Sequence, residues 1–152
     1  MAPIDFLNVP ERLLIFSVGD EYYGVDIATV HEITPCESVT PVPEAPPGML
    51  GIATFRGTQV PVFDLFWKFG VEVGPSTDAN LVVVDYDGSP VALRAGEVHE
   101  VAALPRDAYQ PLSIPGGTGR LTQFEAVAEW HDQLVLWLDP RRLVPAAVAE
   151  AA

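Results

Sequence analysis

Short apolar runs alternate along the chain with breaks rich in glycine and proline, a pattern typical of a mainly β protein. The 15 prolines and 12 glycines among 152 residues disfavour long helices. Short helices are expected over Leu65–Phe69 and after Pro140. The runs with the length of strands are Leu13–Val18, Tyr22–Ile27, Met49–Phe55, Val60–Asp64, Leu81–Tyr86, Val91–Leu93, Glu125–Trp130 and Leu134–Leu138.

The clearest hairpin is the segment LVVVDYDGSPVAL, which begins at Leu81. Within it, Asp87 and Gly88 tolerate the positive φ angles that a tight two-residue turn requires. The letters DYDGS also resemble the start of a calcium-binding loop. A third acidic ligand and the terminal glutamate of such a loop are missing, so a hairpin turn is the better interpretation.

The pattern of the first half recurs in the second. ATVHEI, from Ala28, and GEVHEV, from Gly96, share Val-His-Glu-aliphatic at an offset of 68 residues. MLGIATFRGTQVPVFDL, from Met49, parallels the later FEAVAEWHDQLVLWLDP with an extra seven residues, which we assign to the loop PLSIPGGTG. We therefore predict one β unit used twice, at roughly 13–69 and 81–144. Each unit has about five strands and buries little alone, so the two should pack together with a groove between them.

Composition narrows the possible functions. The formal charge of −13 argues against binding to nucleic acid or anionic lipid, because both would repel the chain. No apolar run approaches ~18 residues, and the first residues do not resemble a signal peptide. A cytoplasmic protein with a packed core and no membrane insertion is expected.

Candidate chemistry is sparse. His31 and His99 occupy matching places in the two units, so shared structure explains them better than metal ligation, and His131 falls in a predicted turn. The single cysteine, Cys36, excludes an internal disulfide, and no basic neighbour activates its thiol. PGGTGR lacks the Lys-Ser/Thr of a phosphate-binding loop. We expect no metal, no cofactor and no catalytic residues.

Aromatic residues gather around the first predicted helix. Packing in a core between the two units is the expected role, and stacking on a cofactor is the alternative. The residues are Phe63, Phe66, Trp67 and Phe69.

Three consecutive segments, FSVGDEYYGVDIATVHEI, TPVPEAPPGMLGIATFRGTQVPVFDL and LVVVDYDGSPVALRAGEVHEV, carry a further signal. Together they resemble the CheW-like domain of bacterial chemosensory systems, from about Arg12 to about Val144. The most specific part is the Arg-Gly step at Arg56, between an aliphatic-Gly-aliphatic run and a later Pro-aliphatic-aliphatic-Asp-Leu.

The resemblance implies one domain over residues 11–149, with tails at 1–10 and 150–152. It implies a fold of two intertwined five-stranded SH3-like β-barrel lobes with a few short helices. It also implies a non-catalytic adaptor in the cytoplasm, recruited to receptor arrays. Such an adaptor couples the cytoplasmic tip of a chemoreceptor (a methyl-accepting chemotaxis protein) to the regulatory domain of a CheA-type histidine kinase.

The resemblance also implies a receptor-facing set of residues: Arg56, Gly57, Glu32, Val30, Val98 and Val101. An unpaired buried guanidinium would cost several kcal/mol. Because the resemblance places Arg56 and Glu32 near the same groove, we predict that Glu32 holds Arg56.

The second unit departs from the family pattern, with Ala92 for a glycine, Arg94 for an aliphatic residue and Gly96 for an aspartate. In the first unit, Phe55 replaces a leucine and Thr54 an asparagine. A divergent adaptor of a pilus-motility or other chemosensory pathway therefore stays open, as does one that inhibits its kinase. The alternative from another class is a β-barrel domain that binds a small molecule, or acts on one, between the lobes.

Overall fold

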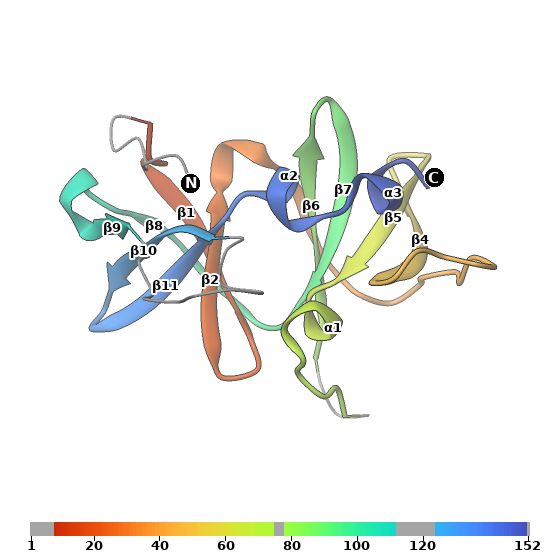
Figure 1. The fold of residues 1–152 in the computed structure, drawn as a ribbon, viewed down its shortest axis with the longest axis horizontal. Helices are drawn as coiled ribbons and strands as arrows, with labels where there is room; N and C mark the ends of the chain where they lie inside the picture. Colours follow the sequence, from red (N-terminus) through yellow and green to blue (C-terminus); the bar gives the residue numbers. More distant parts are fainter. Residues whose placement is uncertain (1–7, 75–77, 112–123, 152) are drawn as a thin grey trace.

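The structure is a computed structural model that describes residues 8–74, 78–111 and 124–151. Two β-sheets lie side by side along the long axis of the molecule (Figure 1). Lobe A is the six-stranded sheet, in the order β8 (Val98–Ala103), β1 (Arg12–Val18), β2 (Glu21–Asp26), β11 (Gln133–Leu138), β10 (Phe124–Trp130) and β9 (Tyr109–Pro111). Lobe B is the five-stranded sheet, in the order β3 (Val30–Pro35), β6 (Asn80–Tyr86), β7 (Ser89–Ala95), β5 (Thr58–Asp64) and β4 (Met49–Phe55).

Helices are few and short, as predicted. They are α1 (Leu65–Phe69), α2 (Pro140–Leu143) and α3 (Ala146–Ala149), with single 3-10 turns η1 (Ile27–Thr29) and η2 (Arg106–Ala108). The helix predicted over residues 65–69 and the one predicted after Pro140 are confirmed. Most of the predicted loop PLSIPGGTG, and all of PGGTGR, lie outside the described residues.

Every predicted strand is present, but β3, β8 and β9 were not predicted as strands. β3 and β8 are outer strands of their sheets, and most of their side chains are exposed. They therefore lack the alternation of buried and exposed positions that marks a half-buried strand. β9 is only three residues long.

The chain is intertwined. β1 and β2 of the first half pair with β8 and β11 of the second, while β6 and β7 of the second half pair with β3 and β5 of the first. The bounds of β6 and β8 follow those of β1 and β3 by 68 residues, and those of β10 follow β4 by 75. Each lobe thus combines two strands of one half with three of the other, and β9 adds a sixth strand to lobe A.

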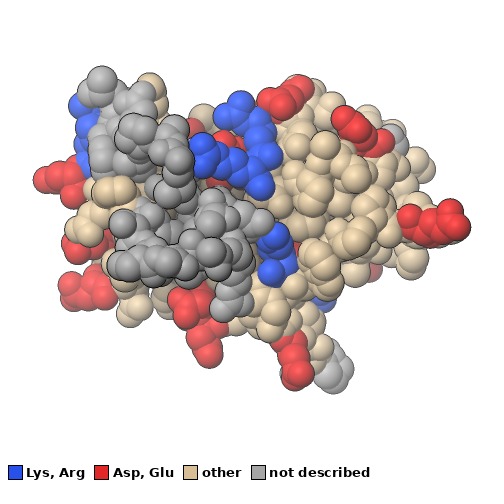
Figure 2. Space-filling model, in the orientation of Figure 1, with Lys and Arg blue, Asp and Glu red and all other residues tan. Residues whose placement is uncertain are grey.

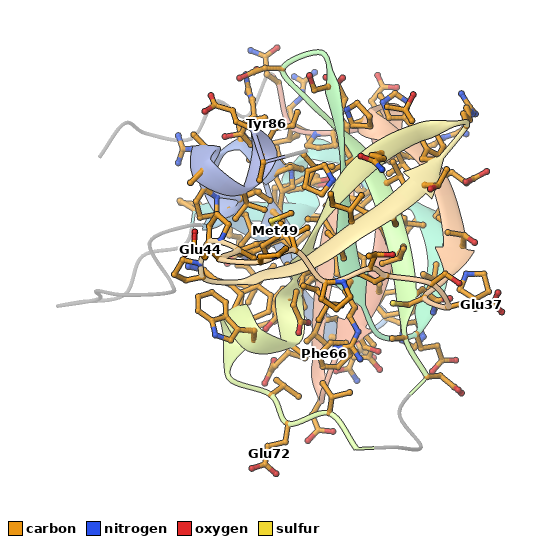
Figure 3. The ribbon with its side chains drawn as sticks, turned by 90° about the vertical axis from the view of Figure 1, so that its right-hand side faces the viewer. Glu37, Glu44, Met49, Phe66, Glu72 and Tyr86 are labelled. Atoms are coloured by element: carbon orange, nitrogen blue, oxygen red, sulfur yellow. The ribbon has the colours of Figure 1, made fainter. Side chains whose placement is uncertain are left out.

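Three apolar cores stabilise this arrangement. The largest lies between the lobes and includes Phe16 and Tyr23 of lobe A with Phe63 and Leu93 of lobe B. A second core fills lobe A, and a third fills lobe B. In the side view of lobe B, Met49 and Phe66 lie within the molecule, whereas Glu37, Glu44 and Glu72 project from its surface (Figure 3).

The predicted aromatic core around α1 is confirmed for three of its four members. Phe63, Phe66 and Phe69 are buried, but Trp67 is 54% exposed. At 3.6 residues per turn, Phe69 lies on the same face of the helix as the buried Leu65, whereas Trp67 lies on the opposite face and points outward. The assignment of Trp67 to the core is therefore wrong.

Asp64 and Asp139 play the same role at the starts of α1 and α2. Each carboxylate accepts a hydrogen bond at 3.0 Å from the backbone N–H two residues later. This satisfies a donor that the first turn of a helix leaves without an intrahelical partner. The correspondence between the two halves thus includes the caps of these helices as well as the strands.

Three hairpins turn through residue pairs with positive φ. The pairs are Arg56 and Gly57 (φ 49 and 77), Asp87 and Gly88 (φ 48 and 91), and His131 and Asp132 (φ 47 and 61). Left-handed conformations at both central residues match the twist of a two-residue hairpin. The predicted turn at Asp87 is confirmed, and Arg56 and His131 occupy the same position in equivalent turns.

Candidate functional site

The predicted receptor-facing residues come from both lobes. Arg56 and Gly57 form the turn between β4 and β5, while Val30 and Glu32 lie at the start of β3, all in lobe B. A contact between the His31 and Phe55 rings, 5.9 Å between centroids, brings the start of β3 beside that turn.

The other two predicted residues, Val98 and Val101, belong to β8 of lobe A. Val98, like Val30, is half-buried against the core between the lobes. Val101 is 44% exposed. Val30 and Val98 thus pack against the same core, one from each lobe.

A β-bulge shapes the start of both β3 and β8. Val98 and Glu100 oppose Phe16 and Ile15, so His99 is an extra residue in the ladder. His31 is the extra residue at the equivalent place in β3. A bulge bends its strand and redirects side chains, and in each lobe it brings the histidine close to the aromatic residue before the hairpin turn.

The predicted ion pair between Arg56 and Glu32 is wrong. Among the described residues these two side chains form no ion pair. The Arg56 guanidinium lies instead over the Phe55 ring, 4.8 Å from its centroid. The prediction assumed burial, whereas both Arg56 and Glu32 are exposed and their charges stay hydrated.

In lobe A, the residues equivalent to Glu32 and Arg56 are Glu100 and His131, and these two side chains do contact each other. Glu100 accepts a hydrogen bond from Trp130 Nε1 at 2.7 Å, and His131 Nε2 lies 3.2 Å from the same oxygen. Glu100 follows Glu32 by 68 residues and His131 follows Arg56 by 75. The repeat alignment therefore contained the signal for this cluster, which we did not predict.

Further rings complete the lobe A cluster. Tyr22 meets Trp130 edge-on at 5.3 Å between centroids and His99 at 5.2 Å. His131 meets Trp130 at 5.0 Å. Lobe B has no aromatic residue equivalent to Tyr22, because the corresponding position is Pro90.

Arg94, one of the departures from the family pattern, is part of the structure rather than of the open surface. Its guanidinium lies 3.3 Å from Asp64 and 5.1 Å from the centre of the Phe66 ring, and its side chain is 17% exposed. It thus links β7 to the cap of α1. At Gly96, another departure, a Cβ would lie 2.6 Å from the Ser17 carbonyl oxygen, so a side chain does not fit.

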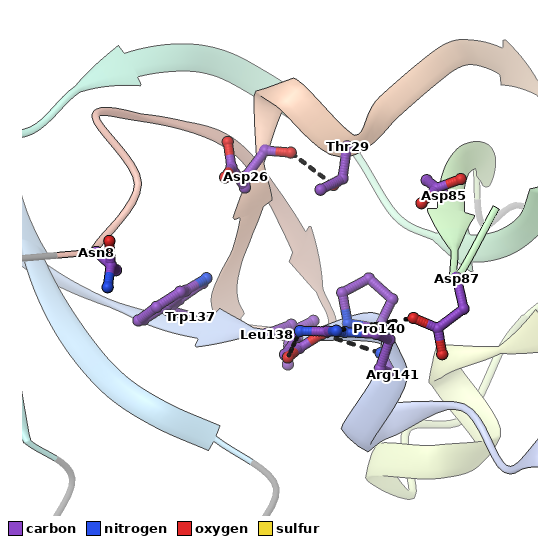
Figure 4. A pocket seen from close by; sticks show the side chains of 10 residues that line it. Asn8, Asp26, Thr29, Asp85, Asp87, Trp137, Leu138, Pro140 and Arg141 are labelled. Atoms are coloured by element: carbon purple, nitrogen blue, oxygen red, sulfur yellow. Dashed lines mark hydrogen bonds and ion pairs between the residues drawn. The ribbon is translucent and has the colours of Figure 1, made fainter. Parts of the chain in front are cut away.

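Two hollows lie where the lobes meet. One, of about 400 Å³, is lined by Asp26, Asp85, Asp87 and Asp139, with Arg141 bridging the last two (Figure 4). Hydrogen bonding to Asp139 raises the pKa of Arg141, with the charges of Asp139 and Asp87 adding to the effect.

The other hollow, of about 720 Å³, lies between Ser17 of lobe A and Phe66 of lobe B. Within the described part of the chain, no three His, Cys, Asp or Glu side chains are grouped to hold a metal ion. Neither hollow contains the predicted receptor-facing residues.

Charge is unevenly spread over the surface. Lys and Arg side chains gather near the middle of the face in Figure 2, where α2 lies in Figure 1, while carboxylates lie around the rim. α2 contains Arg141 and Arg142, the one adjacent pair of basic residues in the sequence. No helix among the described residues is long and apolar enough to cross a membrane.

Two intertwined β lobes around a shared core, with charged and aromatic side chains at their hairpin turns, define a double β-barrel module. Residues 12–148 match the CheW-like domain family, and the chain belongs to that family. It is therefore a non-catalytic scaffold, or adaptor, of chemotaxis signalling.

Individual relatives agree with this assignment. The chain is 30% identical over 142 residues to the chemotaxis protein CheW of Klebsiella aerogenes, covering 90% of this chain and 83% of that one. Identity to the CheW of Treponema pallidum is 28% over 114 residues, covering 71% and 67%. The crystal structure of the scaffolding protein TtCheW from Thermoanaerobacter tengcongensis superposes with a TM-score of 0.77 at 32% identity, covering 86% of this chain and 90% of that one.

Proposed function

We propose that this chain couples the cytoplasmic tip of a chemoreceptor to the regulatory domain of a CheA-type histidine kinase, in the cytoplasm at receptor arrays. Residues 11–149 would act as a single domain made of two repeated β units. Membership of the CheW-like family supports this proposal, since the matched region spans residues 12–148.

The observation that carries the proposal is the exposed guanidinium of Arg56. It stands at the tip of a hairpin, over the Phe55 ring, and forms no ion pair with a described carboxylate. In a chain of net charge −13, a cation that no carboxylate of the described chain neutralises is available to a partner. The planar fork of its donors suits a carboxylate on the partner.

The receptor-facing surface would combine this charge with the aliphatic residues beside it. Arg56, Gly57, Glu32 and Val30 would supply the lobe B side, and Val98 and Val101 the lobe A side. The kinase domain would use the outer ends of the lobes. A specific interface of standard size buries ~800 Å² on each partner, so an apolar area of that order is expected at a lobe end.

The test is the substitution Arg56→Glu. We expect receptor binding to weaken by about tenfold or more, because the reversed charge repels an acidic partner. The melting temperature should change little, since Arg56 is exposed. Binding of a soluble receptor signalling fragment can be measured by pull-down and by calorimetry.

Arg106→Glu is the matched control, because Arg106 is exposed and lies in η2 of lobe A. It makes the same change of charge away from the hairpin turn and should leave binding within about twofold. Since Arg56 and Glu32 form no ion pair, adding Glu32→Arg to Arg56→Glu should not restore binding. Equal binding by Arg56→Glu and the wild type would contradict the proposal.

A further inference from the structure

The two hairpin ends differ in where a cation lies. Between described residues there are two cation–π contacts, Arg56 over Phe55 and Arg94 over Phe66, and both belong to lobe B. The residue of lobe A equivalent to Phe55 is Trp130. No described Lys or Arg lies over its indole, because His131 occupies the place of Arg56.

The Trp130 ring is held in a fixed orientation. Its Nε1 donates to Glu100 at 2.7 Å, and Tyr22 and His131 pack against it edge-on. Indole is the aromatic side chain that attracts a cation most strongly. A ring fixed in advance loses little conformational freedom when a ligand binds.

Glu100 completes the set of groups that a guanidinium requires. Trp130 and His131 both contact its Oε1, and its Oε2 has no hydrogen bond to any described residue. The side chain is 43% exposed, so the second oxygen can be reached from solvent. A carboxylate beside an aromatic ring matches an arginine, whose planar fork binds the first while its face stacks on the second.

The charged residues around this cluster also favour a basic ligand. Glu21, Glu129 and Asp132 are exposed at the neighbouring ends of β2 and β10 and in the turn. Negative charge of this kind increases the rate at which a basic segment associates. The turn of lobe B, by contrast, presents Arg56.

We propose that the hairpin end of lobe A, made by Trp130, Glu100, Tyr22 and His99, binds an arginine side chain of a basic protein segment. The guanidinium lies over the Trp130 indole and donates to Glu100 Oε2. This goes beyond the proposed function, which assigns Arg56 to an acidic partner. Glu100 lies between Val98 and Val101, which belong to the proposed receptor-facing surface. Binding of an arginine peptide is therefore measured separately from receptor binding, so that either proposal can fail without the other.

The probe is a blocked peptide, acetyl-Gly-Arg-Gly-Arg-Gly-amide, added to the full chain and followed by NMR. The indole N–H signal of Trp130, assigned by its loss in Trp130→Phe, should shift on binding. Glu100→Gln should weaken binding about fivefold or more, since it removes a charge-assisted contact. Trp130→Leu should weaken it about threefold, from loss of the cation–π contact.

Glu129→Gln is the matched control, because it removes the same charge as Glu100→Gln. Glu129 precedes Trp130 in β10, and the alternation of a strand directs its side chain to the opposite face of the sheet. It should change affinity less than twofold, and Arg56→Glu should not weaken binding. A peptide with citrulline in place of arginine should not bind. Equal weakening by Glu100→Gln and Glu129→Gln, or unchanged affinity in Trp130→Leu, would show that only net charge attracts the peptide and would overturn the proposal.

Discussion

The two lobes share one plan of strands, bulges and turns, yet their hairpin ends carry opposite charge. Lobe B presents Arg56 over Phe55, and lobe A presents Glu100 beside Trp130. The backbone at the two turns is nearly the same, with φ 49 at Arg56 and 47 at His131. A repeated backbone therefore fixes where side chains lie, and single residues decide which partner chemistry each end can meet.

The strand beside each hairpin also differs. In lobe A, β9 pairs with β10 over three residue pairs. In lobe B, the equivalent contact is a single bridge between Thr40 and Ile52, with both hydrogen bonds at 2.8 Å. In lobe B, an irregular segment thus takes the place of β9. The backbone of this segment lies very close to one residue of β4.

That residue is Gly51, and its substitution should have the largest effect. A Cβ at Gly51 would lie 2.2 Å from the Thr40 carbonyl oxygen, and its φ is 156. The equivalent residue in lobe A, Ala126, carries a methyl group that is fully buried. Gly51→Ala should lower the free energy of unfolding by about 3 kcal/mol or more, from the clash and strain.

The reverse change, Ala126→Gly, is the comparison variant. It should cost about 1 kcal/mol, because glycine loses more backbone freedom in a strand. Both values can be measured by urea denaturation followed by far-UV circular dichroism. Similar losses from the two substitutions would show that the lobes do not differ at this position.

The caps of α1 and α2 give a second comparison, with a smaller effect. Asp64 caps α1 and also pairs with Arg94, and their side chains are 14% and 17% exposed. Asp139 caps α2 but pairs with Arg141, which is 61% exposed. Asp64→Ala should destabilise the protein by about 2–3 kcal/mol, because it removes the cap and leaves a half-buried guanidinium unpaired.

Asp139→Ala removes an equivalent cap but leaves only an exposed arginine. It should cost about 1 kcal/mol or less, since an exposed ion pair contributes little. Asp139 also lines the hollow that contains Asp26, Asp85 and Asp87, so its removal relieves repulsion between carboxylates and should reduce this cost further. If chemical denaturation gives equal losses for the two alanine variants, the pair between Arg94 and Asp64 contributes nothing measurable.

Much of this architecture could be predicted from apolar runs, because strands that bury one or both faces carry a strong pattern. β3 and β8 could not, since outer strands with few buried residues leave no such pattern. The exposure of Trp67 follows from helical spacing and could have been predicted. The partner of Arg56 could not, because it depended on whether the side chain is buried, which a turn sequence does not reveal.

The smallest effect concerns Tyr109 of β9, a strand without a counterpart in lobe B. The residue is buried, and its hydroxyl donates to the Pro10 carbonyl at 2.8 Å. Burial, and secondarily the charge of Asp26, raises the pKa of Tyr109 above its ordinary value of 10. Near neutral pH, Tyr109→Phe should cost only about 1 kcal/mol, the net contribution of one hydrogen bond.

The effect of pH distinguishes this role from simple packing. Because the folded state holds the Tyr109 proton more tightly than the unfolded state, its contribution is fully present below pH ~10 and is lost as pH rises further. Wild-type stability should fall by about 1.4 kcal/mol per pH unit there, and less steeply in Tyr109→Phe. Tyr86→Phe is the variant in lobe B to compare with Tyr109→Phe. It also removes a tyrosine hydroxyl that donates to a backbone carbonyl, that of Val144, at 3.2 Å. Denaturation curves between pH 7 and pH 11 that remain parallel for the wild type and Tyr109→Phe would show that the tyrosine proton is not linked to folding.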